Sequence, residues 1–328
     1  MGGMLVLEWA YFGKDYVRSI VPIATSSRHS AWCISWGEAQ RQSIYADPKY
    51  DDGYYSFSDP PTTGLGAARM SALLTYRSRN SFEARFGRNI PDPSRRQTIR
   101  ERPRPSTPSE THFNIHNDGH KIHRPASSRH NSQNSASGQP NGSNNTTNVP
   151  GDATPDPQFH GPKGDSLTGG DSVPTSTYFS AQSYLRYQGE KFVKRFDSNC
   201  YIAITRKLDT HDVSRDRTAT VAEALALIEQ PALVIGIESD GLFTFAEQQE
   251  LAEHIPNARL ERIDSPEGHD AFLLQFEQVN RYILDFLHQV LPDIMKKEGE
   301  VSVTESSVGQ LTKSSTFGEA EVEDITAW

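Results

Sequence analysis

Cysteine is scarce in this sequence, and long apolar runs are missing. Only Cys33 and Cys200 occur among its 328 residues. Two cysteines are too few for a disulfide framework, which favours a reducing compartment. No apolar run reaches the roughly 20 residues that a membrane-spanning helix needs, and the first residues lack the basic-then-apolar order of a signal peptide. We therefore expect a cytoplasmic protein that does not enter a membrane.

Hydrophobic residues and positive charge are also in short supply. The hydrophobic share is 35%, below the usual value for a packed domain, so part of the chain is expected to stay unfolded. The net charge of -9 argues against a general binder of nucleic acid or membrane surfaces.

The composition changes sharply near Asn89. Residues 89–175 are dominated by Pro, Ser, Asn, Gly, Arg and His, with almost no aliphatic residues. Such a segment cannot bury enough apolar surface to offset the entropy of ordering it. It is therefore predicted to be a disordered insertion, and residues 293–328 are predicted to be a disordered acidic tail. Ordered structure is expected over residues 1–88 and 176–292.

The first ordered block mixes helical and strand-like patterns. Residues 4–13, MLVLEWAYFG, predict a helix that stops at Gly13. Residues 17–26, VRSIVPIATS, form a short β-branched run that predicts a buried strand. Helices are expected again over residues 30–45 and 64–78. The last of these carries small and apolar residues on one side: Leu65, Ala68, Ala72 and Leu73.

The second block repeats the alternation with clearer signals. Capping boxes start two expected helices, Thr220 with Glu223 and Thr244 with Glu247. Strands are expected at residues 231–240 and 258–265. Residues 270–291 predict one long amphipathic helix with apolar positions at three- and four-residue steps: Phe272, Phe276, Val279, Ile283, Phe286 and Val290. Alternating strands and helices indicate an α/β fold with a parallel sheet.

Two polar residues stand where the expected strands end. Asp240 closes PALVIGIESD, and His269 lies 29 residues later in SPEGHDAF, after the next strand. Functional side chains of parallel sheets gather beyond the carboxyl ends of the strands. An Asp followed by a His there is the second half of a Ser…Asp…His order, in which the His moves protons and the Asp fixes its tautomer. Taken singly, each has a plainer interpretation, as a helix cap or a solvated loop residue.

Four stretches together resemble one family. GLGAARMSALLTYRS, FVKRFDSNCYIAITRKLDTHD, PALVIGIESDGLF and EGHDAFL are similar to segments of the homoserine O-acetyltransferases, which are acyltransferases with the α/β-hydrolase fold. The resemblance covers both ordered blocks, and the long polar insertion resembles those of fungal members.

The resemblance implies roles for individual residues. Asp240 and His269 match the catalytic Asp and His, and Asp270 matches the acidic residue that holds the substrate amine. Arg69 matches the arginine that holds the substrate carboxylate, and Tyr76 lines the same pocket. An amino-acid substrate needs a fixed cation and a fixed anion of this kind. Arg69 and Tyr76 are two helical turns apart and so share a face.

The opening residues MGGM match the end of the family's nucleophile elbow, G-G-S-M-G-G-M. Met1 then aligns with the residue after the serine, where it would offer an oxyanion-hole N–H through its backbone. The resemblance thus implies that the chain is a C-terminal portion without the elbow, and without the strands that precede it. We expect such a chain to be inactive alone.

The resemblance also assigns the blocks. Residues 1–88 would hold the helix after the elbow, the sixth strand and the first part of a helical lid, and residues 176–219 the second part of the lid. Residues 220–292 would be the C-terminal α/β core with the catalytic Asp and His, so that the chain as a whole would contain the sixth to eighth strands.

The implied reaction is transfer of acetyl from acetyl-CoA to the hydroxyl of L-homoserine through a serine acyl-enzyme, in methionine biosynthesis. Acetyl-CoA would be a co-substrate and no cofactor would be bound permanently; the full-length enzyme would be a homodimer. Alternatives are a serine or deacetylcephalosporin-type O-acetyltransferase, and a non-catalytic truncated product or pseudoenzyme.

A histidine-rich stretch is a candidate metal site. His112, His116, His120, His123 and His130 lie in one short span, but no cysteine or carboxylate framework fixes their geometry. We expect no metal. No glycine-rich phosphate loop is present, so coenzyme A would be held by side chains and pocket shape.

Overall fold

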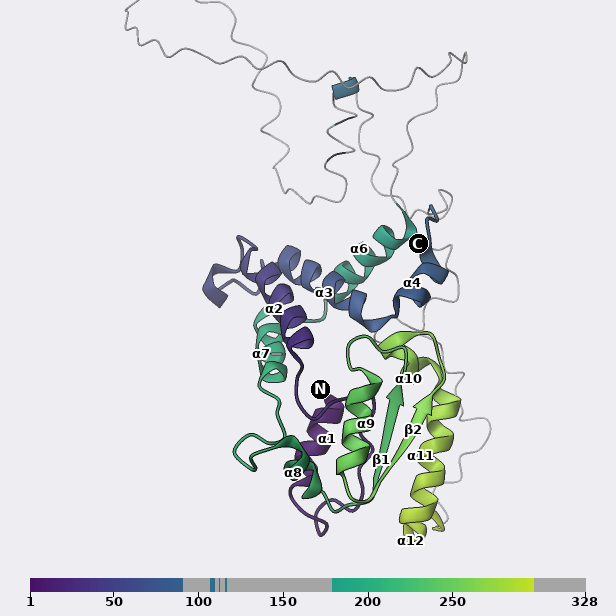
Figure 1. Cartoon of the computed structure of the whole chain (residues 1–328). Coiled ribbons are helices and arrows are strands. Elements are labelled where there is room, and N and C mark those ends of the chain that lie inside the picture. The colour runs from purple at the N-terminus through teal and green to yellow at the C-terminus, as the bar shows by residue number, and fades with distance from the viewer. Residues whose placement is uncertain (91–106, 110–111, 113–115, 117–178, 298–328) are drawn as a thin grey trace, which may run out of the picture. The chain divides into compact units, whose positions relative to one another are not determined.

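The computed structural model describes residues 1–90, 107–109, 112, 116 and 179–297 (Figure 1). The chain divides into two units, Met1–Arg104 with Tyr178–Trp328, and Pro105–Thr177. Nearly all of the second unit lies outside the described residues, and so does most of the predicted insertion. Residues 298–328 of the predicted tail and three of the five histidines, His120, His123 and His130, also lie outside them. The sheet, the helices named below and the candidate site belong to the first unit.

A parallel pair of strands forms the centre of this unit. β1 (Ala232–Ile237) pairs with β2 (Ala258–Ile263), with Ala232 opposite Ala258. Residues 20–24 run beside the other edge of β1, where Ile20 and Ile23 form parallel bridges to Ala232 and Ile235. The strand predicted at residues 17–26 is therefore present only as these bridges. The three segments therefore lie side by side in the order residues 20–24, β1, β2.

Pro22 explains why this third segment is not a regular strand. The amide groups of Ile20 and Ala24 donate to Pro231 and Ile235, and the carbonyls of Ile20 and Pro22 accept from Leu233 and Ile235. The bond missing from this parallel ladder is the one that residue 22 would donate, and proline has no N–H. Ala24 then leaves the extended region with φ of 45°.

The side chains of β1 alternate between two apolar layers. Ala232 and Val234 face α1 (Gly2–Ala10), α8 (Val221–Ala226) and α9 (Phe245–His254), whereas Leu233, Ile235 and Ile237 face α11 (Phe276–Val290). The period of two follows from the pleat of a strand. Figure 1 shows α9 and α11 on opposite sides of the sheet. The result is the helix–sheet–helix layering expected of an α/β fold.

A helical layer adjoins the carboxyl end of the sheet. It contains α2 (Ala31–Tyr45), α3 (Thr62–Tyr76), α4 (Arg79–Phe86), α6 (Ser180–Phe192) and α7 (Ser198–Asp209). A 3-10 turn, η1 (Asp51–Gly53), precedes α3. The core of the helical layer is formed by apolar residues of four helices: Ile44, Leu65, Ala68, Phe192 and Ile202. Gly189 of α6 lies against Gly66 of α3, where an added Cβ would be 3.1 Å from the Gly66 carbonyl oxygen. Glycine lets these backbones approach closely.

Several predicted boundaries need correction. α1 ends at Ala10, three residues before Gly13. The helix predicted over residues 270–291 is two helices, α10 (Ala271–Leu274) and α11, separated by Gln275 with ψ of 43°. α10 continues the turn that carries His269, whereas α11 packs along the sheet, so the chain changes direction between them. Phe276, predicted to be apolar core, is 66% exposed at this break.

Described structure extends past the predicted start of each disordered segment. Asn89 accepts a 2.8 Å hydrogen bond from the Ser180 amide, which joins the two described ends of the insertion. α12 (Pro292–Met295) falls inside the predicted tail, and Asp293 makes two hydrogen bonds with the Arg18 guanidinium. In both places a polar contact fixes residues whose composition alone favours disorder.

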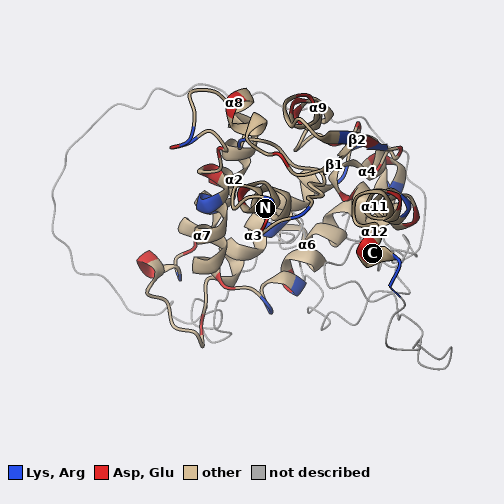
Figure 2. Ribbon diagram, turned by 90° about the horizontal axis from the view of Figure 1, so that it is seen from below, with Lys and Arg blue, Asp and Glu red and all other residues tan. Residues whose placement is uncertain are grey.

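Charge is distributed over the helices of the described residues rather than gathered on one of them. Figure 2 shows basic and acidic segments interspersed along the ribbon. α9 is an exception, because it carries Glu247, Glu250 and Glu253 and neither lysine nor arginine. None of the helices in the described ranges has the length and apolar character needed to cross a membrane.

Candidate active site

Asp240 and His269 meet beyond the carboxyl end of the sheet. Asp240 follows β1, and its side chain is completely buried. Its Oδ1 accepts the backbone N–H groups of Leu242 at 2.8 Å and Phe243 at 3.0 Å, and its Oδ2 lies 2.7 Å from His269 Nδ1. Two backbone donors therefore fix the carboxylate while its other oxygen faces the imidazole. This is the contact that the spacing of the two residues predicted.

The carboxylate sets the tautomer of His269. An ionised carboxylate only accepts hydrogen bonds, so Nδ1 carries the proton and Nε2 of the neutral ring has a lone pair. The His269 ring packs between Phe243, at 5.4 Å between centroids, and Phe272, at 5.5 Å. The side chain is 20% exposed, and among the described residues no group is hydrogen-bonded to Nε2. Such a ring can take a proton from a nucleophile and return it.

The beginning of α1 lies beside this pair. Met4 packs with Cys33 and Phe243, and Phe243 in turn contacts His269. Met1 is the N-cap of α1, its carbonyl accepts from the Leu5 amide, and burial lowers the pKa of its amino group. Within the described residues, no hydrogen bond links Met1 to His269 or Asp240. The predicted oxyanion role of Met1 stays a prediction.

Arg69 and Tyr76 share one face of α3, as their spacing predicted. Arg69 is 4% exposed, and its Nη1 donates to the Tyr76 hydroxyl at 2.8 Å. Its guanidinium also lies over the rings of Tyr76 and Phe192, 5.0 Å from each centroid. Burial raises the pKa of the neighbouring Tyr201, against the charge of Arg69. An arginine held this firmly is a preorganised site for a carboxylate.

Asp270 links this group to the Asp240–His269 pair. It is the last residue of η4 (Gly268–Asp270) and is buried. Burial raises the pKa of its carboxyl group, while Arg77, His269 and Arg69 act to lower it and Asp240 adds to the rise. The structure therefore brings four of the predicted residues, Arg69, Asp240, His269 and Asp270, into one electrostatic neighbourhood.

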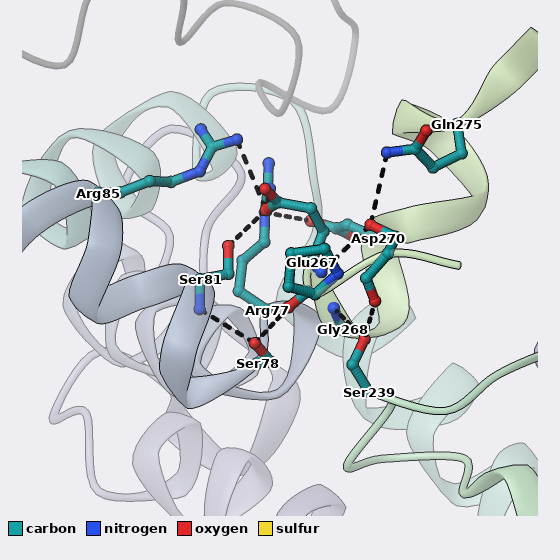
Figure 3. Close-up of polar contacts among 11 residues, drawn as sticks. Arg77, Ser78, Ser81, Arg85, Ser239, Glu267, Gly268, Asp270 and Gln275 are labelled. Carbon is teal, nitrogen blue, oxygen red and sulfur yellow. Dashed lines mark hydrogen bonds and ion pairs between the residues drawn. The ribbon is translucent and has the colours of Figure 1, made fainter. Parts of the chain in front are cut away.

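Sequence reasoning missed a set of contacts that holds the turn before His269. Arg77 and Arg85 both pair with Glu267, and the Ser81 hydroxyl donates to the same carboxylate. The Ser78 hydroxyl donates to the Pro266 carbonyl. We call Arg77, Ser78, Ser81, Arg85 and Glu267 the clasp (Figure 3).

Three of the five clasp residues, Arg77, Ser78 and Glu267, lie within motifs quoted above. Arg77 follows Tyr76 directly, and Glu267 stands two residues before His269. The signal available in the sequence was a pair of opposite charges, Arg77 and Glu267, each standing beside a predicted site residue. Their pairing across 190 residues of chain was not visible in either motif alone.

No group of three or more potential metal ligands comes together in the described part of the chain. Of the histidine-rich stretch, only His112 and His116 belong to that part. The prediction of no metal at the remaining histidines is outside what the structure describes.

Comparison with known proteins gives close relatives. The family model for the alpha/beta hydrolase fold matches residues 1–112. The homoserine O-acetyltransferase of Emericella nidulans is 67% identical over 343 aligned residues, covering 100% of this chain and 67% of that protein. The homoserine O-acetyltransferase of Ascobolus immersus is 65% identical and is covered to 65% of its length. The chain thus spans about two thirds of the length of these relatives.

Solved structures support the fold at much lower identity. A homoserine O-acetyltransferase from Bacillus anthracis superposes with a TM-score of 0.56 at 15% identity, covering 87% of this chain and 57% of that one. The esterase E22 gives 0.55 at 14% identity, covering 88% and 59%. These likenesses establish the α/β-hydrolase fold. Together with the close relatives they show that the chain belongs to the homoserine O-acetyltransferase family of α/β-hydrolase-fold acyltransferases.

Proposed function

We propose that this chain supplies the Asp–His pair and the acceptor pocket of an enzyme that transfers acetyl from acetyl-CoA to the hydroxyl of L-homoserine. The observation that carries the proposal is the 2.7 Å contact between Asp240 Oδ2 and His269 Nδ1, which leaves Nε2 as a base. The names of the close relatives support the acceptor. Because those relatives are longer than this chain, the activity is proposed for the full-length protein, by which we mean the chain completed to their length.

The proposed reaction has two half-reactions. A serine oxygen attacks the thioester carbonyl while His269 takes the serine proton; the C–S bond breaks, and CoA leaves with that proton. The homoserine hydroxyl then attacks the acyl-enzyme, giving its proton to His269, and the serine leaves with it as O-acetylhomoserine is released. We place the serine at the N-terminal end of α1 in the full-length protein, because that end of α1 lies beside Phe243, which contacts His269.

The acceptor would be held at both charged ends. Arg69, fixed by Tyr76 and Phe192, would bind the carboxylate of the amino acid. Asp270 would bind the ammonium group, which places the hydroxyl near His269 Nε2 because the two residues are adjacent. Charge-assisted contacts of this type are roughly twice as strong as neutral ones. The remaining predictions, a cytoplasmic homodimer with no resident cofactor, belong to the same proposal.

The test is an acetyl-transfer assay on the full-length protein. CoA release should depend on L-homoserine, with L-serine and deacetylcephalosporin as the competing acceptors. His269→Ala should abolish it, and Asp240→Asn should lower kcat by roughly a thousandfold or more, because the amide favours the wrong tautomer. The 328-residue chain alone should release no CoA. Preference for another acceptor would replace homoserine in the proposal, and full activity of His269→Ala would overturn it.

A further inference from the structure

One arginine contacts both carboxylates of the turn around His269. Arg77, the C-cap of α3, is buried, with 5% of its side chain exposed. Its Nη1 pairs with Glu267 Oε2, and its Nε lies 3.1 Å from Asp270 Oδ2 (Figure 3). The planar guanidinium presents several donors in a fixed fork, so one side chain can bind two carboxylates at once.

The contact with Asp270 leaves room for a second cation. Arg77 occupies Oδ2, and a carboxylate has two oxygens with about four lone-pair positions. The Asp270 side chain keeps 6% of its surface exposed. An ammonium group can therefore bind the same carboxylate without displacing Arg77. This arrangement differs from that of Glu267, whose Oε2 is shared by Arg77, Arg85 and Ser81.

We propose that Arg77 is the positioning residue for Asp270: it anchors one carboxylate oxygen, so that the other oxygen binds the acceptor's ammonium. The inference rests on the proposed function and deepens it, because it assigns to Arg77 the acceptor half-reaction and not the acetylation of the nucleophile.

The electrostatics of Asp270 give the inference a pH dependence. Asp270 faces Arg77 and Arg69 from α3, His269 from its own turn and Asp240 from the end of β1. The charge of Asp270 also acts on Arg85 of α4. Burial raises the pKa of Asp270, and Arg77 is the first of the groups that oppose the rise. Removal of Arg77 must therefore raise the pKa further. The neutral acid would then persist to higher pH, and ammonium binding would be lost earlier as the pH falls.

Arg77 also belongs to the clasp, so a purely structural role is the competing explanation. In that case its loss would release the turn and misplace His269, which serves both half-reactions. The clasp itself offers the control. Arg85 lies 3.6 Å from Glu267 Oε2 and makes no ion pair with Asp270, so Arg85→Gln weakens the clasp while leaving the Asp270 contact in place. Glu267→Gln also weakens the clasp, because it removes the carboxylate that the two arginines share, and it too leaves the contact between Arg77 and Asp270 in place.

The experiment compares Arg77→Gln, Arg77→Lys, Arg85→Gln and Glu267→Gln in the full-length protein. Pre-steady-state CoA release reports acetylation, and kcat/KM for L-homoserine across pH reports the acceptor step. For Arg77→Gln we expect acceptor kcat/KM to fall tenfold or more, its acid limb to move up by about one pH unit, and CoA release to change less than about threefold. Arg77→Lys should restore the acid limb, because it restores the charge. Arg85→Gln should change neither quantity.

Three results would overturn the inference. Equal losses in both half-reactions for Arg77→Gln would make Arg77 a structural residue, as would the same acid-limb shift in Glu267→Gln. Assays of the wild-type protein test the proposed function separately. If the wild type showed no homoserine-dependent turnover, that result would count against homoserine as the acceptor and not against the role of Arg77. A carboxyl NMR titration of Asp270 in the wild type and Arg77→Gln, which needs no turnover, must still show a higher pKa in the variant. An unchanged pKa would refute the role of Arg77.

Discussion

At the residue scale, Arg69 is where packing and proposed binding coincide. Its guanidinium is stacked on Phe192 and donates to Tyr76, so the charge is in place before a ligand arrives. Because the side chain is already ordered, little binding free energy is lost in ordering it when a ligand binds. It also makes the residue sensitive to truncation, because the side chain fills space between α3 and α6.

Arg69→Ala should impair use of the amino-acid acceptor far more than acetylation by acetyl-CoA. Loss of a charge-assisted contact corresponds to roughly a hundredfold in acceptor kcat/KM, whereas the rate of CoA release should change only slightly. In the full-length protein, steady-state assays with L-homoserine measure acceptor kcat/KM, and rapid mixing with acetyl-CoA measures the rate of CoA release. Tyr76→Phe is the matched control, since it removes the hydroxyl partner and keeps the ring. Similar damage to both half-reactions would remove Arg69 from the acceptor site.

Individual residues also mark how far the sequence could be interpreted. Asp240 and His269 were predictable because strand ends of a parallel sheet meet at one edge, so position along the chain fixes position in space. Arg77 and Glu267 were not, because their contact depends on how α3 docks against a turn from the other block. Local patterns describe which element a residue belongs to. They do not describe which distant element it meets.

At the element scale, the turn that carries His269 is fixed by close packing. Gly268 has φ of 75°, and an added Cβ would stand 2.3 Å from the Ser78 nitrogen and 2.7 Å from the Arg77 carbonyl carbon. The Gly268 amide donates to Ser239 Oγ at 3.0 Å, which ties the turn to the core on its other side. Only glycine fits this conformation without moving the α3–α4 junction.

Gly268→Ala should therefore lower both stability and activity. The left-handed backbone costs about 1 kcal/mol, and relief of the clash adds about 1–3 kcal/mol as in other overpacked sites. His269 follows directly, so CoA release should also slow. Thermal unfolding and CoA release measure the two effects. Gly241→Ala is the control, because nothing lies within 4 Å of a Cβ there. Wild-type behaviour of Gly268→Ala would show that the junction yields easily.

A hydrogen bond joins the two described ends of the predicted insertion. Asn89 and Ser180 stand at the end of α4 and the start of α6 and bond at 2.8 Å, so the chain returns to nearly the point it left. We expect that residues 91–178 can be replaced by a short Gly/Ser linker with turnover within about twofold of the parent, since loop length alters closure entropy by only about 0.6 kcal/mol per doubling. Steady-state assays of the full-length protein with and without the segment decide this. A tenfold fall at unchanged thermal stability would reveal a role for the segment.

Elements with strong local signals were predicted well. Both capping boxes form, at Thr220 with Glu223 and at Thr244 with Glu247, because a cap is made by residues three apart in the chain. The interruption of residues 17–26 was harder to foresee, although Pro22 was visible. A proline harms a strand only if its missing N–H faces a partner, and the direction in which residue 22 faces depends on tertiary pairing.

At the scale of the whole molecule, the feature to test is the outer edge of residues 20–24, the segment that lies beside β1. The inner edge of residues 20–24 bonds to β1 through Ile20, Pro22 and Ala24. The alternate amide groups, those of Val21 and Ile23, point to the opposite edge and have no backbone partner within the described ranges. Both side chains pack into the apolar layer against α11. An apolar edge with unpaired backbone groups is a template for pairing with another chain.

We expect the 328-residue chain alone to self-associate and to protect residues 17–25 poorly from amide exchange. Other exposed apolar groups add to this tendency, because Trp9, Phe12 and Tyr16 form a cluster whose members are 48%, 68% and 66% exposed. Size-exclusion chromatography with light scattering measures association, and hydrogen exchange read by mass spectrometry measures protection. The full-length protein is the comparison, and it should be monodisperse and protected there. A monodisperse 328-residue monomer with slow exchange at Val21 and Ile23 would mean that the chain covers this edge itself.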